Sequence, residues 1–205
     1  MKVLVVAGYG ATPVLRYAPE TEHYLVRVRE LLLKADAMGN PFSHLILCGG
    51  RTQQKTSPGI SEAFAMAKRL EELDMELNVP EHPVSPFFAK LRVVLEEDSF
   101  TSLENAENAG RRIQDLQWEE TFDLEPSITV MCEGMRLLKW QILAKVFFPS
   151  SKKPIRWEIV SWEQMSPLKE LAATIWDTCS VYLPVIGIAM AWWWGWRRRR
   201  RAKYI

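Results

Sequence analysis

The chain has 205 residues, of which 48% are hydrophobic and 25% charged, proportions that are ordinary for a folded protein. Its formal net charge is only +1, although Arg197 to Arg201 and Lys203 place six positive charges in the last nine residues. The remainder is mildly acidic, which argues against a nucleic-acid-binding globule with a basic patch over its main fold.

Strands and helices are expected to alternate along the chain. Residues 2–10, KVLVVAGYG, form a β-branched run that ends in glycine and predicts a buried parallel strand. Residues 20–39 show apolar positions at helical spacing, with Gly39 as a stop. A second strand is expected at 43–50, and Ser61 is expected to open a helix that runs to residue 73.

The same alternation continues to residue 162. Residues 91–97 predict a third strand, and Thr101 or Ser102 would cap a helix over 103–116. A fourth strand at 127–134, a helix at 135–148 and a fifth strand at 154–162 follow. Strands separated by helices imply an α/β fold, a Rossmann-like three-layer sandwich with a mostly parallel sheet of about five strands.

Residues 172–196 predict a transmembrane helix, because Asp177 is the only formally charged residue in this run. A helix of this length covers about 37 Å, enough to cross a hydrocarbon core of about 30 Å with some tilt. Four tryptophans near its end suit an aromatic belt, with the arginines just beyond. A core helix would not bury four such tryptophans, and an interfacial helix would need a polar face that VYLPVIGIAMA does not offer.

We therefore divide the chain into an α/β domain at 1–165, a linker at 166–171, the transmembrane helix at 172–196 and a basic tail at 197–205. The positive-inside rule places the arginines in the cytoplasm, which would put the α/β domain outside. However, the strand-like run after Met1 is too short for an export signal. We expect a single-pass C-terminal anchor with the domain in the cytoplasm and its thiols reduced.

Cysteine and histidine give no sign of a metal site. The three cysteines cannot all pair, and Cys48 and Cys132 lie in apolar runs that predict buried strands. The histidines show no metal-like spacing, and we expect them on the surface or in loops. They are His23, His44 and His82.

Polar motifs follow the predicted strands at the edge where open α/β sheets bind ligands. These motifs are VVAGYG, CGGRT with SEA about ten residues later, EEDSFTSLENAENA, and CEGMRLLK. Glycines let backbone N–H groups approach a ligand, and helix N-termini attract anions. The recurrence of such motifs after each strand predicts an anion-binding edge.

In this order and spacing, the motifs across roughly residues 2–160 resemble the bacterial YdcF/SanA/ElyC family. The resemblance implies a Rossmann-like domain, often membrane-attached, with its polar motifs gathered at one site. Members of the family are linked to cell-envelope integrity and undecaprenyl-phosphate handling, and YdcF is linked to S-adenosylmethionine binding.

The resemblance assigns roles to individual positions. Cys48 replaces the serine of the family's SGG turn, and Thr101 with Ser102 replaces an Asn-Thr pair. In the fourth motif, Arg136 stands where the family has histidine, so a mechanism that needs an imidazole base would fail here. The implied ligand-binding residues are Gly8, Gly10, Arg27 (or Arg29 in another register), Gly49, Gly50, Ser61, Ser99, Ser102, Asn105, Arg136 and Lys139. The implied catalytic residues are Glu62 and Glu104.

Each position also has a purely structural interpretation. Glu62 and Glu104 would stabilise the first turns of their helices through the macrodipole. Arg27 could pair with Glu30 on its own helix, and Asn105 could be a buried residue satisfied by backbone groups. For Ser99 and Thr101, turn and capping roles are equally consistent with the sequence.

We expect a membrane-anchored domain that binds a phosphorylated or nucleotide-like small molecule, including a polyprenyl phosphate, with no metal and with its chemistry and cofactors unassigned. A non-catalytic membrane scaffold on the same fold is the main alternative, since the family's histidine is missing. An S-adenosylmethionine-binding protein is a third, although CGGRTQQK offers no acidic residue for a ribose. We expect no nucleic-acid partner.

Overall fold

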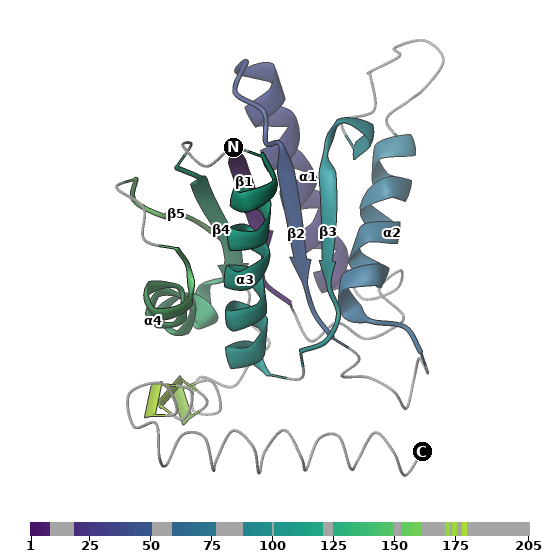
Figure 1. Ribbon diagram of the computed structural model, residues 1–205. Coiled ribbons are helices and arrows are strands. Elements are labelled where there is room, and N and C mark those ends of the chain that lie inside the picture. Colours follow the sequence, from purple (N-terminus) through teal and green to yellow (C-terminus); the bar gives the residue numbers. More distant parts are fainter. Residues whose placement is uncertain are drawn as a thin grey trace.

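The computed structural model describes residues 1–8, 19–50, 59–76, 88–99, 101–120, 125–149, 153–160, 171–172, 174–175 and 178–179. Its centre is a five-stranded sheet in the order β3-β2-β1-β4-β5, in which every pair is parallel (Figure 1). The strands are β1 Lys2–Val6, β2 His44–Cys48, β3 Arg92–Glu96, β4 Ser127–Glu133 and β5 Arg156–Val160. The helices are α1 Pro19–Ala37, α2 Glu62–Met75, α3 Ser102–Glu120 and α4 Leu137–Phe147, with 3₁₀ turns η2 Phe88–Lys90 and η3 Gly134–Arg136.

The sheet separates two apolar layers, because successive side chains of a strand point to opposite faces. In β1, Leu4 and Val6 pack with residues of α1 and α2, while Val3 and Val5 pack with residues of α3 and α4. Figure 1 shows α3 in front of the sheet and α1 behind it. The predicted α/β sandwich is therefore confirmed, and its sheet is parallel throughout the described residues.

The strand order creates one topological switch point. The chain moves outward from β1 through β2 to β3 and then returns to the other side of β1 to form β4. In open α/β sheets, ligands bind where the order reverses, outside the carboxyl ends of the strands. In this chain that place lies between the ends of β1 and β4, where Ala7 donates its N–H to the carbonyl oxygen of Met131 at 2.9 Å.

Side-chain caps set the starts of two helices. The hydroxyl of Ser61 accepts the N–H of Phe64 at 3.0 Å at the start of α2, as the sequence predicted. At α3, Thr101 Oγ1 accepts the N–H of Glu104 at 3.1 Å. Of the two candidate caps, Thr101 therefore makes the hydrogen bond and Ser102 is the first residue of the helix.

The prediction that the histidines lie on the surface or in loops was wrong for His44. This residue begins the interior strand β2, is only 1% exposed, and its Nδ1 lies 2.9 Å from the hydroxyl of Ser43. Strands pair with β2 on both sides, opposite Val3 and Arg92, and therefore cover its first residue. His23 is exposed on α1, as expected, and His82 lies outside the described residues.

The C-terminal segment is described only in part. Of the predicted transmembrane residues 172–196, the structure describes 172, 174, 175, 178 and 179, and all of these are helical. Within the described parts of the chain, no helix has the length and apolar character needed to cross a membrane. The predicted span, the basic tail and the linker at 166–171 fall almost entirely outside those parts.

Candidate ligand site at the carboxyl edge of the sheet

Three glycines let the strand ends approach one another closely. A Cβ atom on Gly8 would overlap the carbonyl oxygen of Cys48, and one on Gly50 would overlap the carbonyl oxygen of Ser99. A Cβ atom on Gly49 would lie 2.7 Å from the Cβ of Glu62. Packing of the strand ends therefore accounts for these glycines without a ligand.

The N-terminus of α2 is already satisfied within the chain. Its first two N–H groups bond to the carbonyl oxygens of Gly50 and Gly49 at 3.1 and 2.8 Å, and the third bonds to Ser61 Oγ at 3.0 Å. The Ser61 hydroxyl in turn donates to the carboxylate of Glu97. The chain's own carboxylate thus sits where the sequence suggested an anionic ligand.

Glu96 is the centre of a second group of contacts, at the start of α3. Its Oε1 accepts the N–H groups of Asp98 and Ser99 at 3.1 and 3.0 Å and the Asn108 amide at 2.9 Å. Its Oε2 lies 2.6 Å from Ser99 Oγ, which also contacts Asn105 Oδ1. Ser99 and Asn105, two predicted ligand residues, are therefore bonded to each other, and Ser99 joins them to Glu96.

Charged side chains gather at the switch point itself. Arg136 donates from Nη1 to the carbonyl oxygen of Gly8 at 2.6 Å, which ties the end of β4 to the end of β1. Its Nε lies 3.7 Å from Oε2 of Glu133, the last residue of β4, whose side chain is fully buried. Lys139 follows on α4 and is 3% exposed. Gly8, Glu133, Arg136 and Lys139 form what we call the switch-point cluster: Arg136 and Glu133 lie where α/β sheets bind ligands, and Lys139 is in the first turn of the helix that follows.

The helix that carries these cations begins without a side-chain cap. Arg136 occupies the N-cap position of α4 and Glu133 that of η3, and neither makes a capping hydrogen bond with its side chain. An N-terminus of this kind attracts anions through its N–H groups and dipole. The start of α4 therefore differs from that of α2, where a serine and a carboxylate fill the same position.

Tyr24 of α1 forms hydrogen bonds at the carboxyl ends of β1 and β4. Its hydroxyl lies 2.9 Å from the carbonyl oxygen of Met131 and 3.1 Å from that of Ala7, and its side chain is buried. Burial, followed by the neighbouring Cys132 thiol, raises the pKa of Tyr24 well above its usual value of 10.0. The phenol therefore remains a donor and links α1 to β1 and β4.

We expect Tyr24→Phe to lower the free energy of unfolding by about 1–3 kcal/mol, because it removes the hydrogen bonding of the buried hydroxyl to the carbonyl oxygens of Met131 and Ala7. Urea unfolding followed by circular dichroism measures the loss. The raised pKa sets the pH dependence: the stabilisation is complete below pH 10.0 and is lost as the pH rises through the pKa of the folded state. Equal unfolding curves for the two proteins at neutral pH would show that the hydroxyl contributes nothing.

The two cysteines near the strand ends are unsuited to nucleophilic chemistry. Burial raises the pKa of Cys132 to about 12, against a smaller opposing effect of Arg136. Burial also raises the pKa of Cys48 well above its usual value, and the neighbouring Glu96 and Glu62 add to the shift. Because the thiolate is the nucleophile, both residues behave as buried apolar side chains.

The structure does not bring all the predicted residues together. Arg27 lies on the exposed side of α1 and pairs with Glu30 at 2.6 Å, which is the structural alternative that the sequence left open. Arg29, the other register, points its Nη1 to the carbonyl oxygen of Leu73 at 3.4 Å, near the end of α2. Neither arginine contacts the switch-point cluster of Gly8, Glu133, Arg136 and Lys139 in the contacts that the structure shows.

The remaining predicted residues divide between the edge and the undescribed parts of the chain. Glu62 is 6% exposed and covers Gly49, while Ser102 and Glu104 are partly exposed in the first turn of α3. Gly10 lies outside the described residues. The predicted catalytic carboxylates are thus on two different helices, α2 and α3.

Sequence reasoning missed the residues that organise this edge, namely Tyr24, Glu96, Glu97 and Glu133. Glu96 and Glu97 stood inside a quoted motif, and a pair of carboxylates directly after an apolar strand was the available signal. Tyr24 showed only helical apolar spacing, which does not reveal a hydrogen bond. Glu133 ends β4 and is only 1% exposed, a burial that no local pattern indicates.

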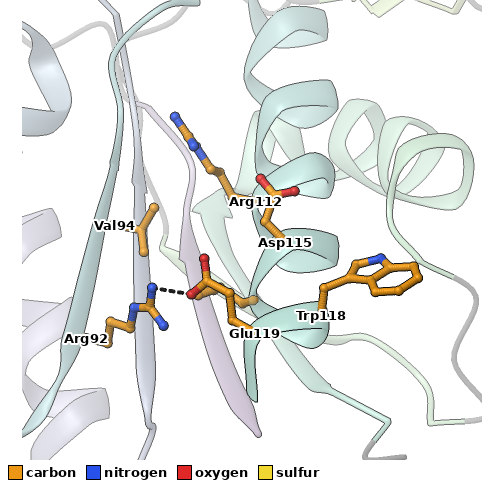
Figure 2. A pocket seen from close by; sticks show the side chains of 7 residues that line it. Arg92, Val94, Arg112, Asp115, Trp118 and Glu119 are labelled. Atoms are coloured by element: carbon orange, nitrogen blue, oxygen red, sulfur yellow. Dashed lines mark hydrogen bonds and ion pairs between the residues drawn. The ribbon is translucent and has the colours of Figure 1, made fainter. Parts of the chain in front are cut away.

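A surface cavity of about 340 Å³ lies away from this edge, between β3 and the second half of α3. Figure 2 shows Arg92 and Glu119 forming an ion pair, 2.5 Å long, across it, with Trp118 directed away from them. Arg92 is the first residue of β3, so the cavity opens toward the amino ends of the strands. Its location does not match the switch point, and we assign it no ligand.

Among the described residues, no group of three or more His, Cys, Asp or Glu side chains is arranged to hold a metal ion. Arg136, Lys139 and the start of α4 are positively polarised and therefore suited to an anion. Comparison of the chain with protein-family models, with curated proteins and with solved structures finds no match.

Proposed function

We propose that this chain binds a phosphorylated or nucleotide-like small molecule, a polyprenyl phosphate included, at the carboxyl edge of its sheet. The observation that carries the proposal is the position of Arg136, a largely buried guanidinium at the β1–β4 switch point, with Lys139 three residues later in the first turn of α4. Guanidinium groups match the geometry of phosphate oxygens, and the uncapped start of α4 adds favourable polarity.

The proposed domain is YdcF-like and anchored by residues 172–196. The sequence supports the anchor through its apolar run, its four tryptophans and the arginines that follow. An anchored domain would have access to phosphate groups at the membrane surface, which connects the unusual C-terminus with an anion site. We assign no reaction, since Glu62 and Glu104 lie on different helices and Arg136 stands where the family's histidine would be.

Loss of the guanidinium is the direct test. We expect Arg136→Ala to weaken phosphate binding about 10- to 100-fold, because hydrogen bonds to a charged group contribute about 1.5–3 kcal/mol. The full-length chain in lipid nanodiscs would be titrated by calorimetry with inorganic phosphate, ADP, a short polyprenyl phosphate and S-adenosylmethionine. Tight binding of one phosphorylated ligand by the wild type, lost in the variant, supports the proposal and names the ligand class.

Arg111→Ala is the matched control, because Arg111 is 67% exposed on α3 and pairs only with Glu107 on the same helix among the contacts seen. Arg136→Lys keeps the charge beside the buried Glu133, so we expect it to fold and to retain part of the affinity. Binding that is equal in the wild type and in Arg136→Ala would overturn the proposal. Binding of S-adenosylmethionine alone would favour the third alternative.

A non-catalytic membrane scaffold is the second candidate, and the start of α2 is the observation that favours it. The donors there are used by Gly49, Gly50 and Ser61, and Glu97 occupies the position of an anion. An edge that satisfies its own polar groups needs no ligand. A well-folded protein that binds none of the four ligands would support the scaffold.

A further inference from the structure

We infer that Glu96 is a proton-carrying positioning residue, whose Oε2 donates a hydrogen bond to Ser99 Oγ and thereby fixes the turn between β3 and α3. This inference concerns the protonation of one buried carboxyl group and goes beyond the proposed ligand. It holds or fails whether or not a phosphorylated molecule binds at the switch point.

The hydroxyl group of Ser99 has one proton for two neighbouring acceptor oxygens. Ser99 Oγ lies 2.6 Å from Glu96 Oε2 and also contacts Asn105 Oδ1, yet a serine hydroxyl has a single proton. An ionised Glu96 would leave two acceptor oxygens competing for that proton. A proton on Oε2 completes the chain, since Glu96 donates to Ser99 and Ser99 donates to Asn105.

The other carboxyl oxygen is compatible with this arrangement. Oε1 receives three donors, from the N–H groups of Asp98 and Ser99 and from the Asn108 amide. A neutral carboxyl group keeps a carbonyl oxygen that accepts these bonds while its O–H points to Ser99. With a proton on Oε2, the O–H donates to Ser99 while the three N–H donors share the two lone pairs of Oε1.

The surroundings of Glu96 oppose a negative charge. Glu96 is 2% exposed, and no described cation forms an ion pair with it. Among the described residues, Cys48 on β2 interacts with Glu96 and also with Glu62 on α2, and Glu97 and Asp98 follow in the same turn as Glu96. In the first turns of α3, Glu104 accompanies the neutral Asn105 and Asn108. These groups are acidic or neutral, so ionisation of Glu96 would bury a negative charge that no described cation pairs with.

The pKa of Glu96 is shifted in the direction that favours the protonated carboxyl group. Burial is the largest influence and raises the pKa of Glu96, while the bonds from Ser99, Asn108 and the backbone lower it less. The folded protein therefore holds this proton more tightly than the unfolded chain. The resulting stabilisation is complete below the unfolded value of 4.5 and is lost as the pH rises through the folded pKa.

Glu96→Gln tests the inference because a glutamine amide reproduces the neutral carboxyl group at every pH. Its oxygen accepts the three donors and its NH₂ group donates to Ser99. Above pH 4.5, we expect the wild type to become less stable than Glu96→Gln. The ratio of the wild-type unfolding equilibrium constant to that of Glu96→Gln should rise by about tenfold for each unit by which folding raises the pKa of Glu96. Urea unfolding of the full chain in detergent from pH 4 to 8 measures this ratio.

Glu158→Gln is the matched control, since Glu158 is exposed on the edge strand β5, and its ratio to the wild type should stay flat. Glu96→Ala removes all the contacts and should be less stable than Glu96→Gln at every pH. If an ionised Glu96 carboxylate stabilised the fold instead, Glu96→Gln would be the less stable protein above pH 4.5, and this result would overturn the inference.

A carboxyl ¹³C titration of the labelled full chain keeps the inference testable if a variant fails to fold. The Glu96 signal should have a midpoint above 4.5. A midpoint at or below that value would show that Glu96 is ionised and that Asn105 donates to Ser99 through its NH₂ group, contrary to the inference. Neither outcome depends on calorimetry with phosphorylated ligands, so a failure here leaves the proposed function standing.

Discussion

Replacing Gly50 by alanine should destabilise the protein by about 3 kcal/mol or more, because the new methyl group would overlap the carbonyl oxygen of Ser99. The nearest atoms are backbone atoms, which cannot move aside as the end of a flexible side chain can. The overlap would force apart the ends of β2 and β3, which are otherwise joined by the hydrogen bond from Gly49 N–H to the carbonyl oxygen of Glu96 at 3.0 Å.

Urea unfolding followed by circular dichroism measures this loss, and Gly134→Ala is the matched control. A Cβ atom on Gly134 would lie 3.3 Å from Cγ2 of Ile159, a side-chain atom of a residue that is half exposed. We therefore expect Gly134→Ala to change the free energy of unfolding by less than about 1 kcal/mol. Equal stabilities of the two variants would mean that the edge accommodates a methyl group and that the close approach of these loops is not required.

Trp140→Ala should lower the free energy of unfolding by about 3–5 kcal/mol, the range for truncating a buried aromatic side chain. Trp140 is 1% exposed in the layer between the sheet and α4, together with Leu143 and Ala144. Because Trp140 directly follows Lys139 on α4, loss of its packing would also release the start of the helix that carries the switch-point cations. We therefore expect weaker phosphate binding in any fraction that remains folded.

Trp118→Ala provides the comparison for Trp140, since Trp118 is 68% exposed on α3 (Figure 2). Its replacement should change the free energy of unfolding by no more than about 0.5 kcal/mol, as is usual for surface positions. Thermal unfolding of both variants under the same conditions separates a loss of core packing from a loss of one indole ring. If Trp140→Ala and Trp118→Ala lowered the free energy of unfolding equally, the assignment of Trp140 to the core would be wrong.

Local patterns predicted the elements well because strands and helices leave short-range signals. The run that contains β1 is apolar on both faces, as expected for a central parallel strand, and each of its residues from Val3 to Val6 is fully buried. Ser61 was recognised as a helix start from residue type and position, and its capping bond confirms the prediction. His44 was misplaced because burial at the first residue of a strand depends on its neighbouring strands, which the local sequence does not name.

The site was predicted less completely, because its contacts join residues that are distant in the chain. Arg136 and Gly8 were both proposed, but their hydrogen bond links positions 128 residues apart and follows from β4 pairing with β1. Arg27 had two consistent interpretations, and only the packing of α1 placed it beside Glu30 in solvent. Glu96 was passed over because its importance lies in the donors that surround it.

The sequence by itself determined the alternation of strands and helices, the layered α/β architecture and the end of each strand at which polar residues collect. These properties depend on the periodicity of apolar residues and on capping and turn residues, which act over a few positions. The tertiary structure alone decided that β1 lies between β2 and β4, that Arg136 reaches the switch point, and that Glu97 accepts the hydroxyl of Ser61 at the start of α2. Burial and long-range pairing set these features, because both depend on which elements become neighbours when the chain folds.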